Sequence, residues 1–211
     1  LGIQSKFVEG QRVTSKETID IVEMVLGGKV NKEIVSKIIM NGGKSVGISG
    51  KDGGFLRVKK VKTSKKSQDL GRVGEITKVD IKLITELQDN GYIPVVAPIG
   101  SNNKGVSYNI NADHAASKIA SSLKAEKLII LTDVPGIQDE KGKLISSITK
   151  KTANSLIRKG VIAKGMVPKV KCLVQALMDG VNKAHIIDGR IPHAVILETF
   201  TDSGIGTEIL L

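Results

Sequence analysis

The chain contains very few aromatic residues: two Tyr, three Phe and no Trp among 211 residues. Its core must therefore be aliphatic, and the 40% apolar content is ample for one domain or two small ones. The single cysteine, Cys172, rules out an intrachain disulfide framework and indicates a reducing compartment. No apolar run approaches the roughly 18 residues of a membrane span, and no signal-peptide pattern is present. We therefore expect no membrane association and a cytoplasmic location, with a plastid as the alternative.

The charge is strongly one-sided, with 32 basic and 21 acidic residues and a net charge of +11. The positive charge is densest in residues 57–66, RVKKVKTSKK, which alternate and lack interleaved aromatics. This pattern favours a solvated hairpin over a nucleic-acid surface, which would also show a steep salt dependence of binding. We expect no nucleic-acid partner. A basic balance also suits anionic substrates.

Helical and strand patterns alternate along the chain. Helical periodicity covers residues 17–26, 32–41, 80–90, 112–124, 150–159 and 168–179. Glycines after these segments are expected to end them, including Gly27-Gly28 after the first, and Asn31 and Asp80 are the expected N-caps. Continuous apolar runs at 45–49, 92–99, 127–132 and 184–187 predict strands covered on both faces.

These patterns predict an α/β fold, a three-layer α/β/α sandwich with a mostly parallel central sheet. Residues 55–79 alternate in polarity with glycine punctuation and predict antiparallel β-hairpins. A boundary near residues 124–125 would separate a hairpin-bearing part, 1–124, from a compact part, 125–211.

The most informative stretch is 107–136, in which an Asn-x-Asn-x-Asp turn opens a helix and a buried strand ends before Asp133 and a Pro-Gly turn. Ligands of open α/β sheets collect at the carboxyl ends of the strands, where Asn109, Asn111, Asp113 and Asp133 are expected. Taken singly, Asp113 is explained as a helix cap and Asp133 as a turn residue. Together they favour a site for phosphate and metal.

Two basic residues stand at further candidate positions. Lys169 lies in the first turn of the helix expected from residue 168, where a cation opposes the helix dipole unless an anionic ligand is bound. Arg12, in GQRVT, has the planar fork that binds a carboxylate through two hydrogen bonds. From spacing alone, Arg12 is explained as a surface residue.

Several common site patterns are missing from the sequence. The glycine-rich stretches at 50–54 and 100–105 match neither a Walker A motif nor G-x-G-x-x-G. The three histidines have no metal-ligand spacing, so we expect no metal held by protein ligands alone. No Ser–His–Asp or Cys–His arrangement predicts a nucleophilic hydrolase.

Eight segments, in order and with compatible spacing, resemble the N-acetylglutamate kinases of the amino-acid kinase superfamily. The matching stretches are GQRVT (10–14), GISGKDGG (47–54), VGEITKVD (73–80), GYIPVVAPIG (91–100), YNINADHAA (108–116), LTDVPGI (131–137), KGMVPKV (164–170) and GIGTEI (204–209). Each stretch is weak alone, but the series is specific. The resemblance implies an amino-acid kinase fold, with 1–124 as the substrate-binding and dimerisation lobe and 125–211 as the ATP-binding lobe.

The resemblance also implies roles for individual residues. Arg12 and Asn109 would bind N-acetyl-L-glutamate, Asp113 would organise the catalytic lysines, and Lys169 would stabilise the transferring phosphoryl group. The nucleotide-binding residues implied in this way are Asp133, Val134, Pro135, Gly136, Ile137, Gln138, Val161, Ile162 and Ala163. The implied reaction is ATP-dependent phosphorylation of the substrate's side-chain carboxylate, the second step of arginine biosynthesis, with Mg²⁺ held mainly by the nucleotide phosphates.

Regulation and assembly are likewise implied by the resemblance. The tail 197–209, LETFTDSGIGTEI, resembles members inhibited by L-arginine, with Glu198, Gly204 and Gly206 as the arginine-binding candidates. A homodimer or hexamer and a PII-type signalling partner are expected from the same resemblance. The family begins with a strand that carries a second catalytic lysine and with glycine-rich turns, which this chain does not show. We therefore expect an N-terminal truncation that leaves the chain as given inactive.

Two other interpretations stay open. One is a different amino-acid kinase, acting on glutamate, aspartate, carbamate or UMP. The other is a truncated, non-catalytic domain that binds arginine or a regulatory partner.

Overall fold

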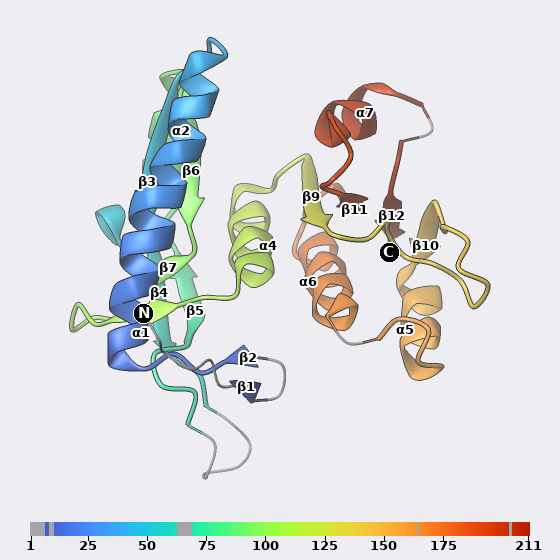
Figure 1. The fold of residues 1–211 in the computed structure, drawn as a ribbon, viewed down its shortest axis with the longest axis horizontal. Helices are drawn as coiled ribbons and strands as arrows, with labels where there is room; N and C mark the ends of the chain where they lie inside the picture. Colours follow the sequence, from blue (N-terminus) through green and yellow to red (C-terminus); the bar gives the residue numbers. More distant parts are fainter. Residues whose placement is uncertain (1–6, 9–10, 63–68, 164, 203) are drawn as a thin grey trace. The chain divides into compact units, whose positions relative to one another are not determined.

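A computed structural model describes residues 7–8, 11–62, 69–163, 165–202 and 204–211 (Figure 1). The chain forms two compact units, Leu1–Ala115 and Ala116–Leu211. Their division lies within helix α4 (Ala112–Leu123), whereas the sequence analysis placed it just after that helix. The functional roles expected for the two parts stay predictions.

The first unit contains short strands, one long helical segment and two larger groups of strands. Its elements are β1 (Phe7–Val8), β2 (Gln11–Arg12), α1 (Lys16–Val22), the π-helical η1 (Glu23–Val30), α2 (Asn31–Met40), β3 (Ser45–Ser49), the 3₁₀ turn η2 (Asp52–Gly54), β4 (Leu56–Lys60), β5 (Gly74–Val79), α3 (Lys82–Asp89), β6 (Ile93–Ala97), β7 (Ile99–Ser101) and β8 (Ser107–Asn109), followed by the start of α4.

The sheets of this unit combine parallel and antiparallel pairs. Strands β3 and β6 pair in parallel, with Ser45 opposite Ile93. A second sheet has the order β5-β4-β7-β8, in which β4–β5 and β7–β8 are antiparallel. The antiparallel hairpin expected within residues 55–79 is therefore confirmed for the described strands, and residues 63–66 of the basic stretch 57–66 lie outside the described residues.

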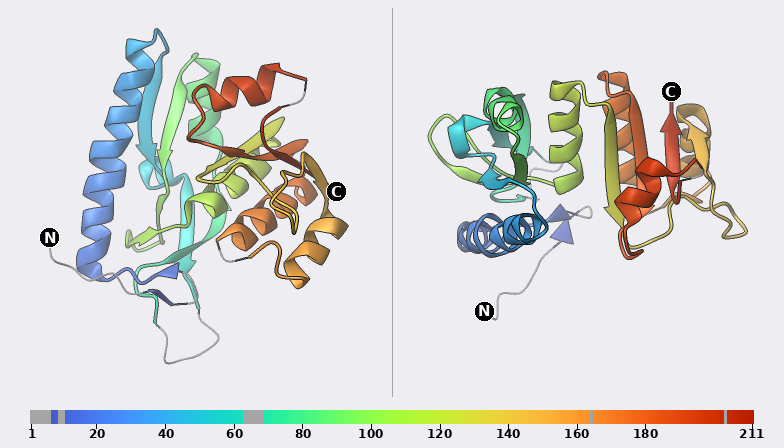
Figure 2. Two further views of the ribbon diagram at one scale, coloured as in Figure 1. Left: turned by 45° about the vertical axis from the view of Figure 1, so that its right-hand side comes forward. Right: turned by 90° about the horizontal axis from the view of Figure 1, so that it is seen from above.

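One expectation about the first helices is wrong. Gly27 and Gly28 do not end the first helix, because α1, η1 and α2 run without a break from Lys16 to Met40, beside β3 (Figure 2). Neither glycine has the positive φ that ends a helix, whereas Gly42, just beyond α2, has φ +84°. At these glycines the helix does not end but continues as the π-helical stretch η1.

Asn31 was expected to cap a helix, but it anchors the helix to the sheet. The residue is only 2% exposed, and its Nδ2 donates to the carbonyl oxygens of Val95 (2.9 Å) and Ile48 (3.3 Å). Its Oδ1 lies against Gly47, where an added Cβ would come within 1.8 Å of that oxygen. The absence of a side chain at Gly47 therefore lets Asn31 reach both parallel strands.

The second unit is built on one four-stranded sheet. Besides most of α4, it contains β9 (Lys127–Thr132), β10 (Ser147–Thr149), α5 (Lys150–Arg158), α6 (Met166–Met178), β11 (Lys183–Asp188), α7 (Ala194–Phe200) and β12 (Thr207–Leu210). The strand order is β10-β12-β11-β9, with β9–β11 and β10–β12 parallel and β11–β12 antiparallel. The sequence analysis missed α7, β10 and β12.

Helices cover both faces of this sheet. Along β11, Ala184 and Ile186 join the apolar cluster that contains Leu173 of α6. His185 lies between them in sequence and contacts Glu198 of α7. Because successive strand residues point to opposite faces, α6 and α7 pack on opposite sides of the sheet. The predicted α/β/α fold class, with a largely parallel sheet, is confirmed.

Within the described part of the chain, no helix combines the length and the apolarity that crossing a membrane requires.

Substitution of Gly47 tests the anchor between helix and sheet. Gly47→Ala is expected to lower the free energy of unfolding by about 1–3 kcal/mol, because the new methyl group collides with Asn31. The matched control is Gly28→Ala, where the nearest atom would be 4.0 Å from the new Cβ. That change is expected to stabilise the helix by roughly 0.5–1 kcal/mol. Urea unfolding measures both, and a Gly47→Ala protein as stable as the parent would contradict the anchor.

Candidate active site

The first unit brings Asn109 close to the segment that carries Arg12. Asn109 ends β8, and its backbone N–H donates to the carbonyl oxygen of Arg72 at 2.8 Å. Its Nδ2 donates to Oγ1 of Thr14, a fully buried residue, at 3.4 Å. Arg12 stands two residues before Thr14, in β2. The two candidate substrate residues thus lie on neighbouring backbone segments.

Asp113 lies in the first turn of α4, and its side chain is half-buried. Oδ1 of Asn111 accepts the backbone N–H of His114 at 3.1 Å, so Asn111 caps the helix and Asp113 does not. A carboxylate in the first turn is stabilised by the helix dipole. The cap that the sequence analysis weighed for Asp113 is therefore supplied by Asn111.

In the second unit, one edge of the sheet gathers several candidate residues. Parallel strands β9 and β11 end side by side, with Thr132 opposite Asp188, and Asp133 follows directly. Helix α6 packs on β11 and enters it through a short turn, so it runs antiparallel to the strand. Its N-terminus, with Lys169 in the first turn, therefore lies at the edge where β9 and β11 end.

The two segments expected to bind nucleotide contain both exposed residues and buried anchors. In the first segment, Asp133, Val134 and Gln138 are exposed, whereas Ile137 is 1% exposed and its N–H donates to Oγ1 of Thr207 at 2.9 Å. In the second segment, Ile162 is buried in the same apolar cluster. The buried residues fix these segments to the core, and the exposed ones are free to contact a ligand.

The structure adds a pair that the sequence analysis missed, Asp188 and Arg190. Oδ1 of Asp188 accepts the backbone N–H and Nε of Arg190, both at 2.9 Å, and Oδ2 accepts Nη2 at 2.8 Å. The hydrogen bonds from Arg190 lower the pKa of Asp188 to about 2. The same hydrogen bonds raise the pKa of Arg190, and the charge of Asp133 adds to this effect. The sequence signal was Asp-Gly-Arg directly after an apolar strand.

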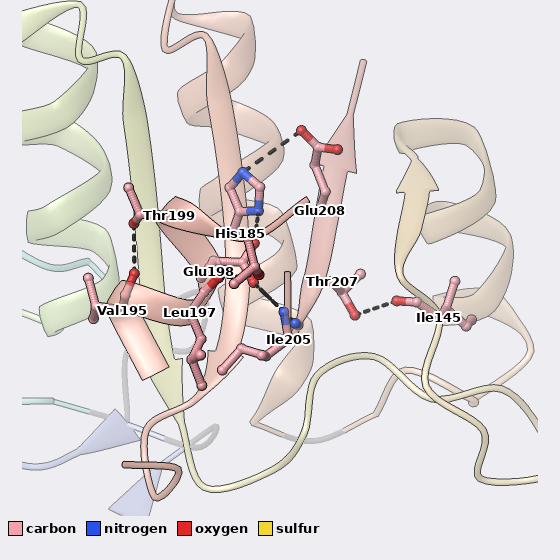
Figure 3. Close-up of polar contacts among 11 residues, drawn as sticks. Ile145, His185, Val195, Leu197, Glu198, Thr199, Ile205, Thr207 and Glu208 are labelled. Carbon is pink, nitrogen blue, oxygen red and sulfur yellow. Dashed lines mark hydrogen bonds and ion pairs between the residues drawn. The ribbon is translucent and has the colours of Figure 1, made fainter. Parts of the chain in front are cut away.

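The residues expected to bind arginine come together at Glu198 of α7. Figure 3 shows Glu198 with its partner Ile205. Oε2 of Glu198 accepts the backbone N–H groups of Ile205 at 2.8 Å and Gly206 at 3.2 Å. Gly204 has φ +60°, and a Cβ there would lie 2.8 Å from Oε2 of Glu198. The Glu198 side chain is buried and organises the turn that holds both glycines. The sequence alone did not reveal this role.

His185 lies against the same carboxylate from β11. Its Nδ1 is 2.6 Å from Oε1 of Glu198, and its Nε2 is 3.8 Å from Oε1 of Glu208. Burial lowers the pKa of His185, and the charge of Lys127 lowers it further, although both carboxylates act in the opposite direction. The ring is thus neutral at physiological pH.

Among the described residues, no three His, Cys, Asp or Glu side chains gather as they would around a protein-held metal ion. The carboxyl edge of the second unit instead presents a lysine, an arginine and backbone N–H groups, which suit an anionic ligand. These groups lie at the carboxyl ends of the parallel strands β9 and β11, beside the carboxylates of Asp133 and Asp188.

Comparison with known proteins gives the class. Residues 1–188 match the model of the amino acid kinase family. The chain is 53% identical to acetylglutamate kinase of Geotalea uraniireducens over 99% of its own length and 74% of the relative's length. It is 50% identical to acetylglutamate kinase of Persephonella marina, over 100% of this chain and 75% of that one.

Solved structures of other proteins have a similar fold. N-acetylglutamate synthase from Neisseria gonorrhoeae, determined with coenzyme A and N-acetyl-glutamate, superposes with a TM-score of 0.89 at 27% identity. The match covers all of this chain but 47% of that one. Carbamate kinase from Giardia, at 21% identity and a TM-score of 0.63, shares the fold.

The chain belongs to the amino acid kinase family and, within it, to the acetylglutamate kinases. It is a kinase, a transferase for which the family implies ATP as a substrate.

The buried His185 predicts a pH dependence of stability. Since the folded state keeps the imidazole neutral while the unfolded chain takes up a proton near pH 6.5, acid favours unfolding. The free energy of unfolding should fall as pH drops from about 7 to about 5, above the range in which most carboxyls titrate. Urea unfolding across this range measures it.

His185→Gln should reduce that dependence, because it removes the buried titrating group. His193→Asn should preserve it, since His193 is exposed and asparagine tolerates its φ of +59°. An unchanged pH dependence in His185→Gln would assign the effect to another group.

Proposed function

We propose that this protein transfers the γ-phosphoryl group of ATP to the side-chain carboxylate of N-acetyl-L-glutamate, the second step of arginine biosynthesis. The observation that carries the proposal is about 50% identity to acetylglutamate kinases over essentially the whole chain. The lysine and the arginine at the carboxyl edge of the second unit support it, since both substrates are anionic.

The residue chemistry fits this reaction. The acceptor carboxylate is already ionised at neutral pH, so it attacks the γ-phosphorus without a general base. The reaction instead requires that two anions be held in line and that the charge on the transferring phosphoryl group be stabilised. A kinase of this kind needs lysines, arginines and helix N-termini, which the chain supplies, and no catalytic His or Cys.

We assign the residues as follows. Arg12 and Asn109 bind the acetylated substrate, and the side chain of Asn109 donates a hydrogen bond to Thr14, two residues after Arg12. Asp113 orients the catalytic cations. Lys169, near the N-terminus of α6, stabilises the phosphoryl group. The nucleotide lies against the exposed residues of 133–138 and 161–163.

Mg²⁺ would accompany the nucleotide and neutralise part of its phosphate charge. We propose that the phosphates supply most of its ligands. This fits the described residues, which offer no group of three His, Cys, Asp or Glu side chains for a divalent ion.

The test is ADP release with ATP–Mg²⁺ and either N-acetyl-L-glutamate or free glutamate. Because the chain spans about three quarters of the length of its relatives, the protein is assayed at its natural length. Turnover is expected only with the acetylated substrate. Lys169→Ala should lower kcat by about a hundredfold or more, since one preorganised donor to the transition state is worth about 3 kcal/mol.

Lys171→Ala is the matched control, because it removes the same charge from an exposed position on α6. It should retain kcat. Full activity of Lys169→Ala would remove Lys169 from the mechanism, and turnover with aspartate, carbamate or UMP instead would move the assignment to another amino-acid kinase. No turnover with any acceptor by a folded protein would favour a non-catalytic binding domain.

We further propose feedback inhibition by L-arginine at the turn organised by Glu198, Gly204 and Gly206. The buried carboxylate of Glu198 holds the turn through two backbone N–H groups, so the shape of the site depends on it. Saturating arginine should slow the parent enzyme. Glu198→Gln should require roughly tenfold more arginine or more, whereas the exposed Asp202→Asn, on the same segment, should respond normally. A parent enzyme indifferent to arginine would refute this control.

For assembly we propose a homodimer or hexamer, supported by exposed apolar residues on α2 and β6: Ile34, Ile39, Met40 and Ile93. Sedimentation equilibrium measures the assembly directly. A PII-type signalling partner and a cytoplasmic location, with a plastid as the alternative, are proposals that rest on the resemblance to the family and on the single cysteine.

A further inference from the structure

Asp188 makes more contacts with Arg190 than the turn between them requires. Asp188 ends β11 and is 5% exposed, whereas the side chain of Arg190 is 63% exposed. A buried carboxylate is costly unless it is paired and hydrogen-bonded. A backbone N–H alone would suffice to close the turn, as in other Asx-turns. Here the carboxylate also binds a guanidinium and fixes its direction.

The contacts occupy one edge of the guanidinium. Nε and Nη2 bind the two oxygens of Asp188 side by side, in the bidentate geometry that fixes an arginine most firmly. Among the described residues, Nη1 takes part in no hydrogen bond, and the exposed side of the group carries its remaining N–H donors. Arginine keeps its charge at all physiological pH values. The edge of the sheet therefore presents a fixed cation with donors directed to solvent.

The position of this cation is set by the strands. Asp188 lies opposite Thr132 in the parallel register, and the N–H of Gly189 donates to the carbonyl oxygen of Thr132 at 2.8 Å. Asp133 directly follows Thr132 in the chain, and its charge acts on Arg190. The turn at Gly189 is close-packed, since a Cβ there would lie 3.1 Å from Cβ of Leu131. Arg190 is thus held beside the first residue of the nucleotide segment.

We propose that Arg190 binds the phosphate groups of the nucleotide through its exposed edge, with Asp188 as its positioning residue. This inference rests on the proposed nucleotide site at residues 133–138 and adds a residue to it. An oxyanion is the ligand that matches the group, because the planar fork binds phosphate oxygens in pairs. A polyphosphate reaching this edge would contact a guanidinium whose orientation is already fixed, so little side-chain entropy is lost on binding.

The test is equilibrium binding by isothermal titration calorimetry, with ATP–Mg²⁺, ADP and adenosine as probes. Arg190→Ala should weaken ATP binding by about ten- to a hundredfold, because hydrogen bonds to a charged group are worth roughly 1.5–3 kcal/mol. Adenosine, which lacks phosphates, should bind as in the parent. Arg190→Lys should fall in between, since it keeps the charge but not the bidentate geometry.

Two further variants complete the design. Lys183→Ala removes one positive charge from the exposed, opposite end of β11 and should leave all three affinities unchanged. Asp188→Asn keeps the arginine but weakens its fixation, and it should reduce ATP affinity while sparing adenosine. Thermal unfolding of each variant checks that the fold is retained.

The outcomes separate this inference from the proposed function. Parental ATP affinity in Arg190→Ala would overturn the inference and leave the kinase assignment intact. Equal losses for ATP and adenosine would assign the pair a purely structural role and also overturn it. A parent protein that binds no ATP would overturn both the inference and the nucleotide site on which it rests.

Discussion

The parallel pairing of β9 with β11 is the constraint on which the chemistry of the second unit depends. Six residue pairs, from Lys183 opposite Lys127 to Asp188 opposite Thr132, make the two strands end at the same level. A shift by one residue would exchange the faces of β11, directing His185 into the apolar cluster and Ile186 toward Glu198. It would also separate Asp133 from Arg190. The register therefore fixes both the polar contacts on one face and the ionic groups at the edge.

The edge and the two faces of this sheet carry different kinds of residues. The carboxyl edge collects charge from a loop, a helix N-terminus and the Asp188–Arg190 turn, as open α/β sheets generally do. One face packs an aliphatic core against α6, and the other holds the His185–Glu198 contact against α7. The proposed phosphoryl-transfer site and the proposed regulatory site thus share β11 as their common element.

Sequence reasoning succeeded where a local signal decided the structure. Gly91 and Gly160 were expected to end helices, and both have the positive φ typical of such a position. The apolar runs at 45–49 and 127–132 correctly predicted strands. It failed at Gly27-Gly28, where tertiary contacts through Asn31 favour a continuous helix. The candidate residues for substrate and nucleotide came from the resemblance. The burial of Glu198 was not predictable, because it depends on a turn without periodicity. The Asp188–Arg190 pair did have a local signal, Asp-Gly-Arg directly after an apolar strand, which the sequence analysis did not use.

The buried anchors of the two nucleotide segments have a mechanical consequence. Ile137 and Ile162 stand far apart in sequence but enter one apolar cluster, together with Leu173 and Val170 of α6. The exposed residues beside them are therefore carried on a single close-packed body whose parts resist independent displacement. A strain introduced anywhere in that cluster would be transmitted to both segments and to the helix bearing Lys169 at once. The relative positions of the two nucleotide segments and of the part of α6 that carries Lys169 therefore depend on the packing of the whole cluster.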